Sequence, residues 1–159
     1  MRRIACLTHL TTGILALMLL CCFYLFGGAT RGERIAMDAL GHLDAPYVLG
    51  KAGPEQFDCS GLIVHCFKKQ GVSLSHSAED IGADARGRAL SSPAQLRTGD
   101  IVCFDTVQDR DPSDHVGIWL GGNRFVHASS AKGKVIVSEL TGYYLEHFTG
   151  GRRILCPYF

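Results

Sequence analysis

Residues 57–62 read Phe57-Asp58-Cys59-Ser60-Gly61-Leu62, and they stand where a loop rich in glycine and proline meets an amphipathic stretch. Asp58 is a good N-cap residue, because its carboxylate can accept a hydrogen bond from a free backbone N–H of the first helical turn. Apolar side chains then recur at helical spacing, and Gly71 suits the position just past a helix end. We therefore predict a helix that carries Cys59 in its first turn.

A cysteine at this position has its sulfur near the positive end of the helix dipole, which lowers the free energy of the thiolate. The neighbours Ser60 and Gly61 are small, so nothing large on the helix would bury the sulfur. A structural thiol is the alternative, as for any helical cysteine. We predict that Cys59 is a nucleophile and that a histidine from elsewhere completes a Cys–His pair.

Two downstream histidines, His115 and His127, flank a predicted β-hairpin. A three-residue loop at 121–123 would place His127 opposite Gly117, and the two histidines would then be diagonal neighbours on one face of the sheet. A loop shorter by one residue would put them on opposite faces. We predict the even register, with room at Gly117 for the two rings to meet.

The predicted roles follow from this arrangement. Cys59 attacks a carbonyl carbon, while His115 takes the thiol proton or holds the thiolate as an ion pair, and later protonates the leaving amine. His127 bonds the far nitrogen of His115 and sets its tautomer. The backbone N–H of Cys59 is the expected oxyanion donor, and the phenol of Tyr47 is a candidate for the second.

The order of the predicted elements indicates the fold class. Helices come first, at Arg31–Leu43, after Asp58 and within Ser77–Asp84, and the rest of the stretch up to Arg97 reads as irregular. Strands follow at Ile101–Asp105, His115–Leu120, Arg124–Ser129, Lys134–Glu139 and Arg152–Leu155, with a helical turn or two within Thr141–His147. This order predicts an α+β fold, in which N-terminal helices carrying the nucleophile pack on an antiparallel sheet of about five to six strands.

With these residues in view, the chain resembles the NlpC-type cell-wall peptidases, papain-like enzymes that cut peptidoglycan stem peptides. The resemblance runs from about Ile35 to Leu155, so residues 30–159 would form an NlpC-type catalytic domain. Its landmarks are Tyr47-x-x-Gly50, Phe57-Asp58-Cys59-Ser60-Gly61-Leu62, Leu96-x-x-Gly99-Asp100-Ile101-Val102, His115-Val116-Gly117-Ile118-x-Leu120-Gly121 and Phe125-Val126-His127-Ala128.

The resemblance implies the nucleophile, base and third polar residue already named, with a tyrosine near the oxyanion at Tyr47. It also implies that Asp58 and Ser60 line the substrate cleft. The expected reaction is hydrolysis of an amide next to a D-amino acid, commonly the γ-D-glutamyl–diaminopimelate bond, with no cofactor and no metal. One departure is Lys51 directly after Gly50, where the family often has a second glycine, so the charge at the cleft entrance would differ.

Three alternatives remain beside this interpretation. Related papain-like enzymes include amidases of other wall bonds and lipid acyltransferases that use the same cysteine and histidine. A metal-binding module could use Cys59, His115 and His127 as ligands, although ligand pairs at short spacing are missing. A catalytically dead scaffold is the third, and the presence of all three residues counts against it.

The N-terminus predicts export. Arg2 and Arg3 precede an apolar run that ends in small residues at Ala29, so residues 1–29 read as a cleaved signal peptide or, alternatively, a retained anchor. A lipidated cysteine in this segment is a third interpretation. We expect the domain in the periplasm or cell envelope, or secreted, with two further partners left open: a membrane through residues 4–28 and a protein regulator.

Composition excludes some partners. Without residues 1–29 the chain has 14 lysines and arginines against 15 acids, and no basic run, so a nucleic-acid partner is not expected. Cys66 and Cys103 stand in apolar surroundings and read as small buried hydrophobes, although either could pair with Cys156. The sequence suggests no partner for His42, His76 or His147, which are expected in solvent, and His65 reads as a surface or satisfied histidine.

Overall fold

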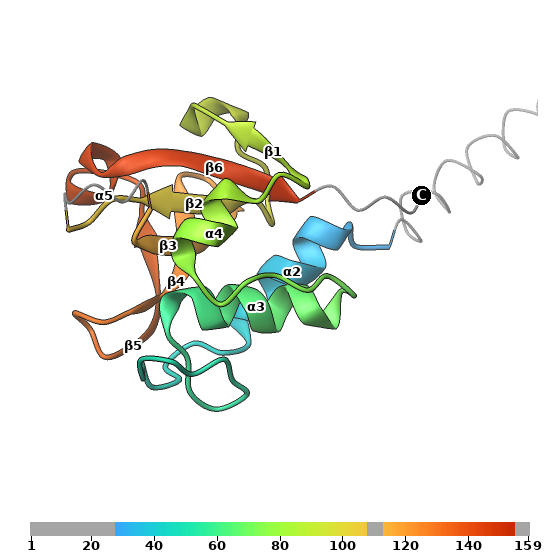
Figure 1. Cartoon of the computed structure of the whole chain (residues 1–159), viewed down its shortest axis with the longest axis vertical. Helices are drawn as coiled ribbons and strands as arrows, with labels where there is room; N and C mark the ends of the chain where they lie inside the picture. Colours follow the sequence, from blue (N-terminus) through green and yellow to red (C-terminus); the bar gives the residue numbers. More distant parts are fainter. Residues whose placement is uncertain (1–27, 108–112, 155–159) are drawn as a thin grey trace, which may run out of the picture.

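The computed structural model describes residues 28–107 and 113–154, which form a six-stranded antiparallel sheet with helices packed on one face (Figure 1). The strand order is β1-β6-β2-β3-β4-β5. The helices are α2 (Arg31–Leu40), α3 (Cys59–Lys69), α4 (Ala78–Ala83) and α5 (Tyr143–Glu146), with a 3₁₀ turn η1 (Pro93–Gln95). The strands are β1 (Gly87–Leu90), β2 (Ile101–Phe104), β3 (His115–Gly121), β4 (Arg124–Ser129), β5 (Lys134–Glu139) and β6 (Phe148–Ile154). This confirms the predicted α+β class and sheet.

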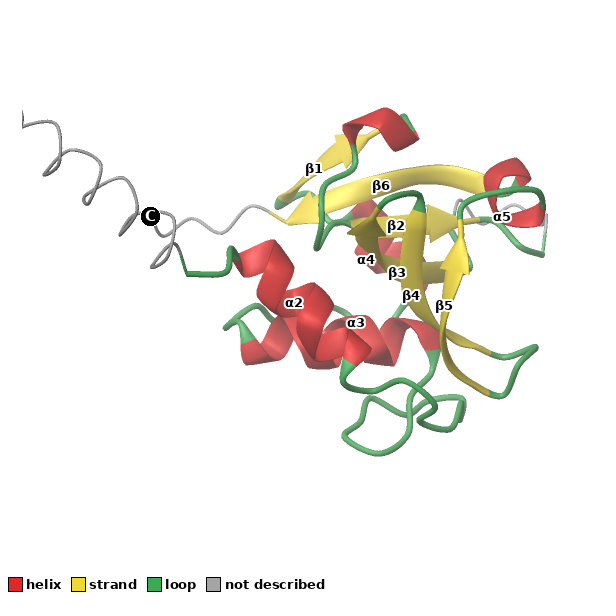
Figure 2. Cartoon of the chain, turned by 180° about the vertical axis from the view of Figure 1, so that it is seen from behind, coloured by secondary structure: helices red, strands yellow, loops and turns green. Residues whose placement is uncertain are grey.

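Both faces of the central strands are buried, which explains why these strands read as nearly continuous apolar runs. Figures 1 and 2 show α2 and α3 side by side against one face of the sheet. The core on that face includes Ile118 and Val126, and a second core on the other face includes Phe104, Trp119 and Phe125. Alternate residues of one strand therefore belong to different cores.

Helix α3 begins and ends as its sequence predicts. The Asp58 Oδ1 accepts a 2.7 Å hydrogen bond from the Gly61 backbone N–H, as an N-cap should. At the other end Gly71 has a φ of 77°, and the Val72 N–H bonds the Phe67 carbonyl. Glycine adopts this left-handed backbone conformation at the end of a helix easily, whereas a residue with a Cβ would resist it.

Helix α2 is shorter than predicted. Thr30 and Glu33 form a capping box at its start. The helix ends at Leu40, because Gly41 is its C-cap and the next amides bond carbonyls three residues back instead of four. The stretch to Leu43 is therefore a turn and not helix.

The irregular stretch before Arg97 was predicted wrongly, and β6 begins earlier than Arg152. That stretch contains β1 and η1, and β1 pairs with β6 at the sheet edge. Gly150 and Gly151 weaken the strand signal in the sequence of β6. Glycine is needed at position 151, because a Cβ there would lie 2.9 Å from the Ile101 carbonyl oxygen of β2. Glycine in a strand here reflects the close approach of the neighbouring backbone.

The hairpin between β3 and β4 keeps the even register by a different route. Ile118 pairs with Val126 and Trp119 with Phe125, as the three-residue loop predicted. The loop itself has only the two residues 122–123, both with positive φ, and Gly121 pairs with Arg124. A bulge at the end of β3 absorbs one residue, so the shorter loop and the bulge cancel and the parity is preserved.

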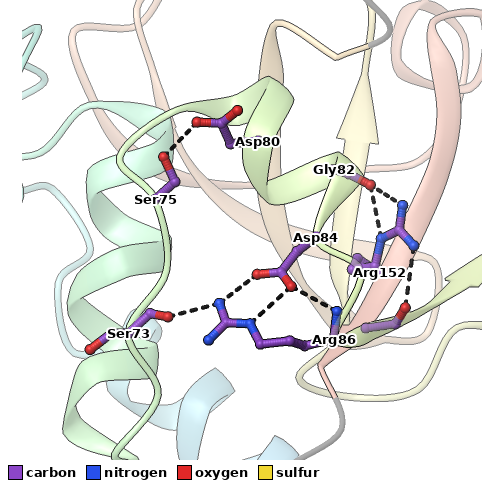
Figure 3. A network of polar contacts seen from close by, with 8 residues as sticks. Ser73, Ser75, Asp80, Gly82, Asp84, Arg86 and Arg152 are labelled. Carbon is purple, nitrogen blue, oxygen red and sulfur yellow. Dashed lines mark hydrogen bonds and ion pairs between the residues drawn. The ribbon is translucent and has the colours of Figure 1, made fainter.

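A polar network attaches α4 and the loop before it to the sheet (Figure 3). Arg86 binds the Asp84 carboxylate through Nε and Nη2, and its Nη2 also donates to the Ser73 carbonyl at 2.9 Å. Arg152 of β6 donates to the carbonyl of Gly82 at the end of α4. These bonds hold α4 where the sequence offered only weak helical signals.

Some sequence predictions lie outside the described residues. They include the signal peptide or anchor, which falls almost entirely within residues 1–27, and Cys156. In residues 28–107 and 113–154, no helix is both long and apolar enough to cross a bilayer. Cys66 and Cys103 are buried free thiols, as predicted.

We predict that Gly61→Ala destabilises the fold around α3. A Cβ at Gly61 would lie 2.0 Å from the Lys51 carbonyl oxygen, and backbone cannot yield as a flexible side chain does. We expect the free energy of unfolding to fall by about 2 kcal/mol or more, despite the helix propensity of alanine. Urea unfolding of the uncleaved full-length chain measures this, with Gly28→Ala in the same chain as the control, because nothing lies within 4 Å of a Cβ there. Equal stability of both variants would contradict the packing described here.

Candidate active site

The sulfur of Cys59 lies against the backbone on both sides of His115. Cys59 is the first residue of α3 and is part-buried. Its Sγ is 4.0 Å from the Asp114 carbonyl oxygen, and the Val116 N–H lies within hydrogen-bonding reach of the sulfur. The backbone N–H groups of Ser60 and of Cys59 itself also point at it. The starts of α3 and β3 thus both direct backbone donors at the sulfur.

The two histidines meet on one face of the sheet, as predicted. His115 Nε2 and His127 Nδ1 are 2.8 Å apart, and the rings are nearly perpendicular at 86°. Gly117 leaves the room between them, since a Cβ there would lie 3.3 Å from the His127 Cβ. The far nitrogen of His115 is therefore the one that His127 contacts, and Nδ1 of His115 is left for another partner.

Behind the pair lies a chain of polar groups that the sequence analysis missed. His127 is 1% exposed, and its Nε2 lies 2.9 Å from Ser138 Oγ and 3.4 Å from the Tyr144 hydroxyl. Ser138 stands on β5, where its face follows from the pairing of His127 with Ile136. The register of β4 with β5 was the signal that could have identified it, because residues diagonal to a strand residue share its face.

These contacts suit one set of tautomers. If His115 is to accept a proton at Nδ1, its Nε2 must carry the hydrogen and donate to His127 Nδ1. His127 then carries its own hydrogen on Nε2 and donates to Ser138 Oγ. The polar chain behind His127 is thus arranged to hold His115 with its free lone pair on the side away from His127.

Burial governs the protonation of this site. It lowers the pKa of His115 to about 4, against a raising contribution from the Asp114 carboxylate, and it lowers the pKa of His127 to about 3. Burial, followed by the nearby Asp58 carboxylate, raises the pKa of Cys59 above its ordinary value, and the backbone N–H groups only partly oppose this. Both shifts favour a neutral thiol beside a neutral imidazole at pH 7.

This corrects the expectation that the helix start lowers the free energy of the thiolate enough to shift the pKa of Cys59 downward. The start of α3 does supply N–H groups to the sulfur, but desolvation and Asp58 outweigh them. Of the two predicted roles for His115, the one that fits is proton acceptor during attack, and not the resting partner of a preformed ion pair.

Asp58 and Ser60 are both buried, and their visible contacts are to the protein itself. Gly50 N–H donates to Asp58 Oδ2 at 2.7 Å, and His76 Nε2 lies 2.9 Å from Asp58 Oδ1, which the Ser60 hydroxyl also contacts. Burial acts to raise the pKa of Asp58, but the bonds from His76, Gly61 and Gly50 outweigh it and lower that pKa. His76 is therefore partnered, where the sequence analysis had assigned it to solvent. A substrate contact for Asp58 or Ser60 stays a prediction.

Tyr47 lies near the thiol. It is part-buried and forms an isolated bridge with Phe57, two residues before Cys59. Burial raises the pKa of its phenol, and the charges of Cys59 and Asp58 add to that rise. This proximity is consistent with a phenol close to the oxyanion, and its role there stays a prediction.

A cavity of about 90 Å³ adjoins the histidine pair. Hydroxyl side chains line much of it, from Thr106, Ser129, Ser130, Tyr143 and Tyr144. Two larger cavities, of about 570 and 520 Å³, lie elsewhere: one between α4, β1 and β6, the other beside α2. The largest hollow is thus not the one beside the reactive groups, and we assign the site by chemistry and not by size.

A metal held jointly by Cys59, His115 and His127 does not fit this geometry. The two histidine nitrogens that face each other are 2.8 Å apart and share a hydrogen bond, so one of them carries a proton and has no lone pair to offer. The alternative of a metal-binding module at these three residues is therefore not supported. A thiol at a helix start beside a histidine pair instead defines a site of the cysteine-hydrolase type.

The sequence profile of the NlpC/P60 family matches residues 44–153. This chain belongs to the NlpC/P60 family. It is 36% identical over 110 residues to "Murein DD-endopeptidase MepS/Murein LD-carboxypeptidase" of Escherichia coli (strain K12), covering 69% of this chain and 55% of that protein. It is also 36% identical over 128 residues to "Gamma-DL-glutamyl hydrolase" of Bacillus subtilis (strain 168), covering 79% of this chain and 30% of that protein.

A solved structure supports the same fold. NlpC2 from Trichomonas vaginalis superposes with a TM-score of 0.71 at 27% sequence identity, covering 80% of this chain and 47% of that one. The papain-like α+β fold is confirmed. The chain spans about half the length or less of these relatives, so their full activities are not carried over by similarity alone.

We predict that the free energy of unfolding falls as the pH is lowered from about 6.5 to about 4. The unfolded imidazole of His115 binds a proton near 6.5, whereas the folded one does so only near pH 4. Protons therefore favour the unfolded chain within this window, by about 2–3 kcal/mol for His115 if it acts alone. Urea unfolding at several pH values measures the slope.

His115→Asn is the matched variant for this experiment, because asparagine keeps a polar group and cannot titrate. Its slope between pH 4 and 6.5 should be shallower than that of the unmodified chain. His127, His42 and His65 also have pKa values lowered mainly by burial, so part of the slope remains in the variant. Identical slopes would show that His115 is not held neutral by the fold.

Proposed function

We propose that this chain is a cysteine peptidase that hydrolyses an amide bond in peptidoglycan stem peptides. The observation that carries the proposal is the sulfur of Cys59 lying 4.0 Å from the carbonyl oxygen of Asp114, the neighbour of His115, whose Nε2 lies 2.8 Å from His127 Nδ1. Family membership and the names of the relatives support it, since one is named a murein endopeptidase and carboxypeptidase and another a glutamyl hydrolase.

In the proposed reaction, Cys59 Sγ attacks the scissile carbonyl carbon while Nδ1 of His115 takes the thiol proton. The pair begins neutral, so charge separates only as the carbon–sulfur bond forms. The backbone N–H of Cys59 and the phenol of Tyr47 are proposed to stabilise the oxyanion. His115 then protonates the leaving amine, and a water molecule activated by the same ring hydrolyses the thioester.

His127 is proposed as a positioning residue that acts through His115. Its hydrogen bond keeps the lone pair of His115 on Nδ1, the nitrogen proposed to accept the thiol proton, and it stabilises the imidazolium that forms during attack. Ser138 contacts the opposite nitrogen of His127. The histidine row, which consists of His115, His127 and Ser138, therefore depends on β3, β4 and β5 remaining in register.

For the bond cleaved, we propose the γ-D-glutamyl–diaminopimelate amide. A D,D-cross-link is the second candidate, because the Escherichia coli relative is named a DD-endopeptidase. The small cavity lined with hydroxyl groups beside His115 and His127 favours a peptide over the acyl chain of a lipid acyltransferase. A peptidoglycan substrate places the domain outside the cytoplasm, which fits the proposed export by residues 1–29, while a protein regulator is proposed only as an open partner.

We predict that the full-length chain, purified in a mild detergent, releases fragments from purified muropeptides. Mass spectrometry of the products identifies the bond: cleavage before diaminopimelate supports the γ-D-glutamyl assignment, and separation of cross-linked dimers supports the D,D-bond. Cys59→Ala should abolish turnover, because it removes the thiol that attacks the scissile carbonyl carbon. Intact muropeptides with the unmodified chain would contradict the proposal, and equal cleavage by Cys59→Ala would contradict the nucleophile.

We also predict that the acid limb of kcat/KM lies near pH 4, well below the ordinary histidine value of 6.5. His115 must be neutral to accept the thiol proton, so activity is lost as the pH falls through its pKa. His127→Ala should lower kcat by about 10²-fold or more and move this limb, whereas a merely structural residue would leave the limb in place. An acid limb at 6.5 would contradict the burial of His115.

A further inference from the structure

Three side-chain atoms away from the catalytic site are buried without any hydrogen-bond partner: Asp38 Oδ2, His42 Nε2 and His65 Nε2. Among the residues that the structure describes, no other buried side-chain nitrogen or oxygen atom lacks a hydrogen-bond partner. Native folds seldom leave such atoms without a partner, and an ion or a water molecule is the usual reason. All three belong to one place, which makes a common partner the simplest account.

The three atoms converge from two helices. Asp38 lies on α2, His42 follows one turn later just past the helix end, and His65 lies in the middle of α3. Their ligand atoms all lie within 4.8 Å of one another. The histidine rings stand edge to face with centroids 4.9 Å apart. The Phe57 ring packs on both and closes the site on its apolar side.

The protonation of the rings suits metal binding. The Ala52 carbonyl accepts a hydrogen bond from His65, and because Nε2 has no partner, that bond belongs to Nδ1. The lone pair of His65 is therefore on Nε2, the atom that faces the cluster, and a backbone carbonyl on the other nitrogen is how ligating histidines are commonly oriented.

We propose that Asp38, His42 and His65 bind a divalent transition-metal ion of the zinc class, which joins α2 to α3. Two imidazole nitrogens and one carboxylate oxygen are a common zinc donor set, and a water molecule would complete the tetrahedron. Bonds of about 2.1 Å place tetrahedral ligands about 3.4 Å apart. Small side-chain rotations that close the present separation of up to 4.8 Å are sufficient.

Two neighbouring groups limit the alternatives. Lys69 Nζ binds Asp38 Oδ1 at 2.6 Å, which occupies one carboxylate oxygen and leaves Oδ2 for the ion. The Lys69 side chain is 48% exposed, so its charge is largely screened by water. The Cys66 thiol also contacts the Asp38 carboxylate, and burial raises the pKa of that thiol. Cys66 is a neighbour of Asp38, and the group of converging ligand atoms consists of Asp38, His42 and His65 without it.

The proposed site is separate from the catalytic one. His65 lies six residues after Cys59, which is about 9 Å along the helix axis. The ion would act structurally, by holding the turn after α2 and the Phe57 ring against α3. Phe57 directly precedes the Asp58 cap, so the ion would stiffen the loop that leads to the nucleophile without touching the reacting atoms. The proposal does not rest on the peptidase function.

The test compares zinc binding by two versions of the full-length chain, both carrying Cys59→Ala so that the catalytic thiol cannot hold zinc. One has no other change and the other also carries His42→Gln and His65→Gln. Each is stripped with a chelator, exposed to zinc sulfate, dialysed and analysed for zinc by mass spectrometry. We expect about one more equivalent of zinc in the first chain, and a zinc-dependent rise in its Tm of about 5 °C or more that the double variant lacks.

Both chains share every other cysteine and histidine, so the difference isolates the proposed site. Asp38→Asn gives a second, gentler variant, with Asp44→Asn as its exposed control: zinc content should fall only with Asp38→Asn. Circular dichroism shows whether the variants remain folded. Equal zinc content in both chains, or no zinc-dependent change in Tm, would overturn the proposal and leave a buried water as the partner of the three atoms.

Discussion

The buried carboxylate of Asp58 holds the catalytic end of this fold together. One of its oxygens caps α3 through the Gly61 N–H, and the other accepts from the Gly50 N–H in the glycine-rich loop. A buried charge is stable only when several donors surround it, and here the ring of His76 is a further partner. This one side chain therefore sets the start of the helix, the path of the loop and the position of Cys59.

The same carboxylate limits the chemistry of its neighbour. Its charge, together with burial, raises the pKa of Cys59 and opposes the stabilisation that the helix start provides. The pKa values of His115 and His127 are lowered as well, because both rings are buried. A neutral thiol beside a neutral imidazole is the balance of these effects. Such a pair keeps its proton-accepting nitrogen free over a wide range of acidity.

The position of the histidine row depends on the parity of one hairpin. A strand that slips by one residue turns every side chain to the other face, so His115 and His127 could meet only in the even register. The chain reaches that register with a two-residue loop and a bulge, where the sequence suggested a three-residue loop without one. The prediction that the two histidines share one face was correct, although the predicted loop length was wrong. The shorter loop and the bulge each shift the pairing by one residue, and the two shifts cancel.

Local pattern was enough to predict helix α3 with its cap, the central strands and the meeting of His115 with His127 on one face of the sheet. Capping, helical spacing and strand alternation act over a few residues, and these signals survive without tertiary contacts. Tertiary structure alone decided the strand β1, the glycine-rich start of β6, the support of His127 by Ser138, and the cluster of Asp38, His42 and His65. These features arise where segments distant in the chain pack together and exclude water, and burial of this kind, which also reverses the expected pKa of Cys59, leaves no periodic trace in the sequence.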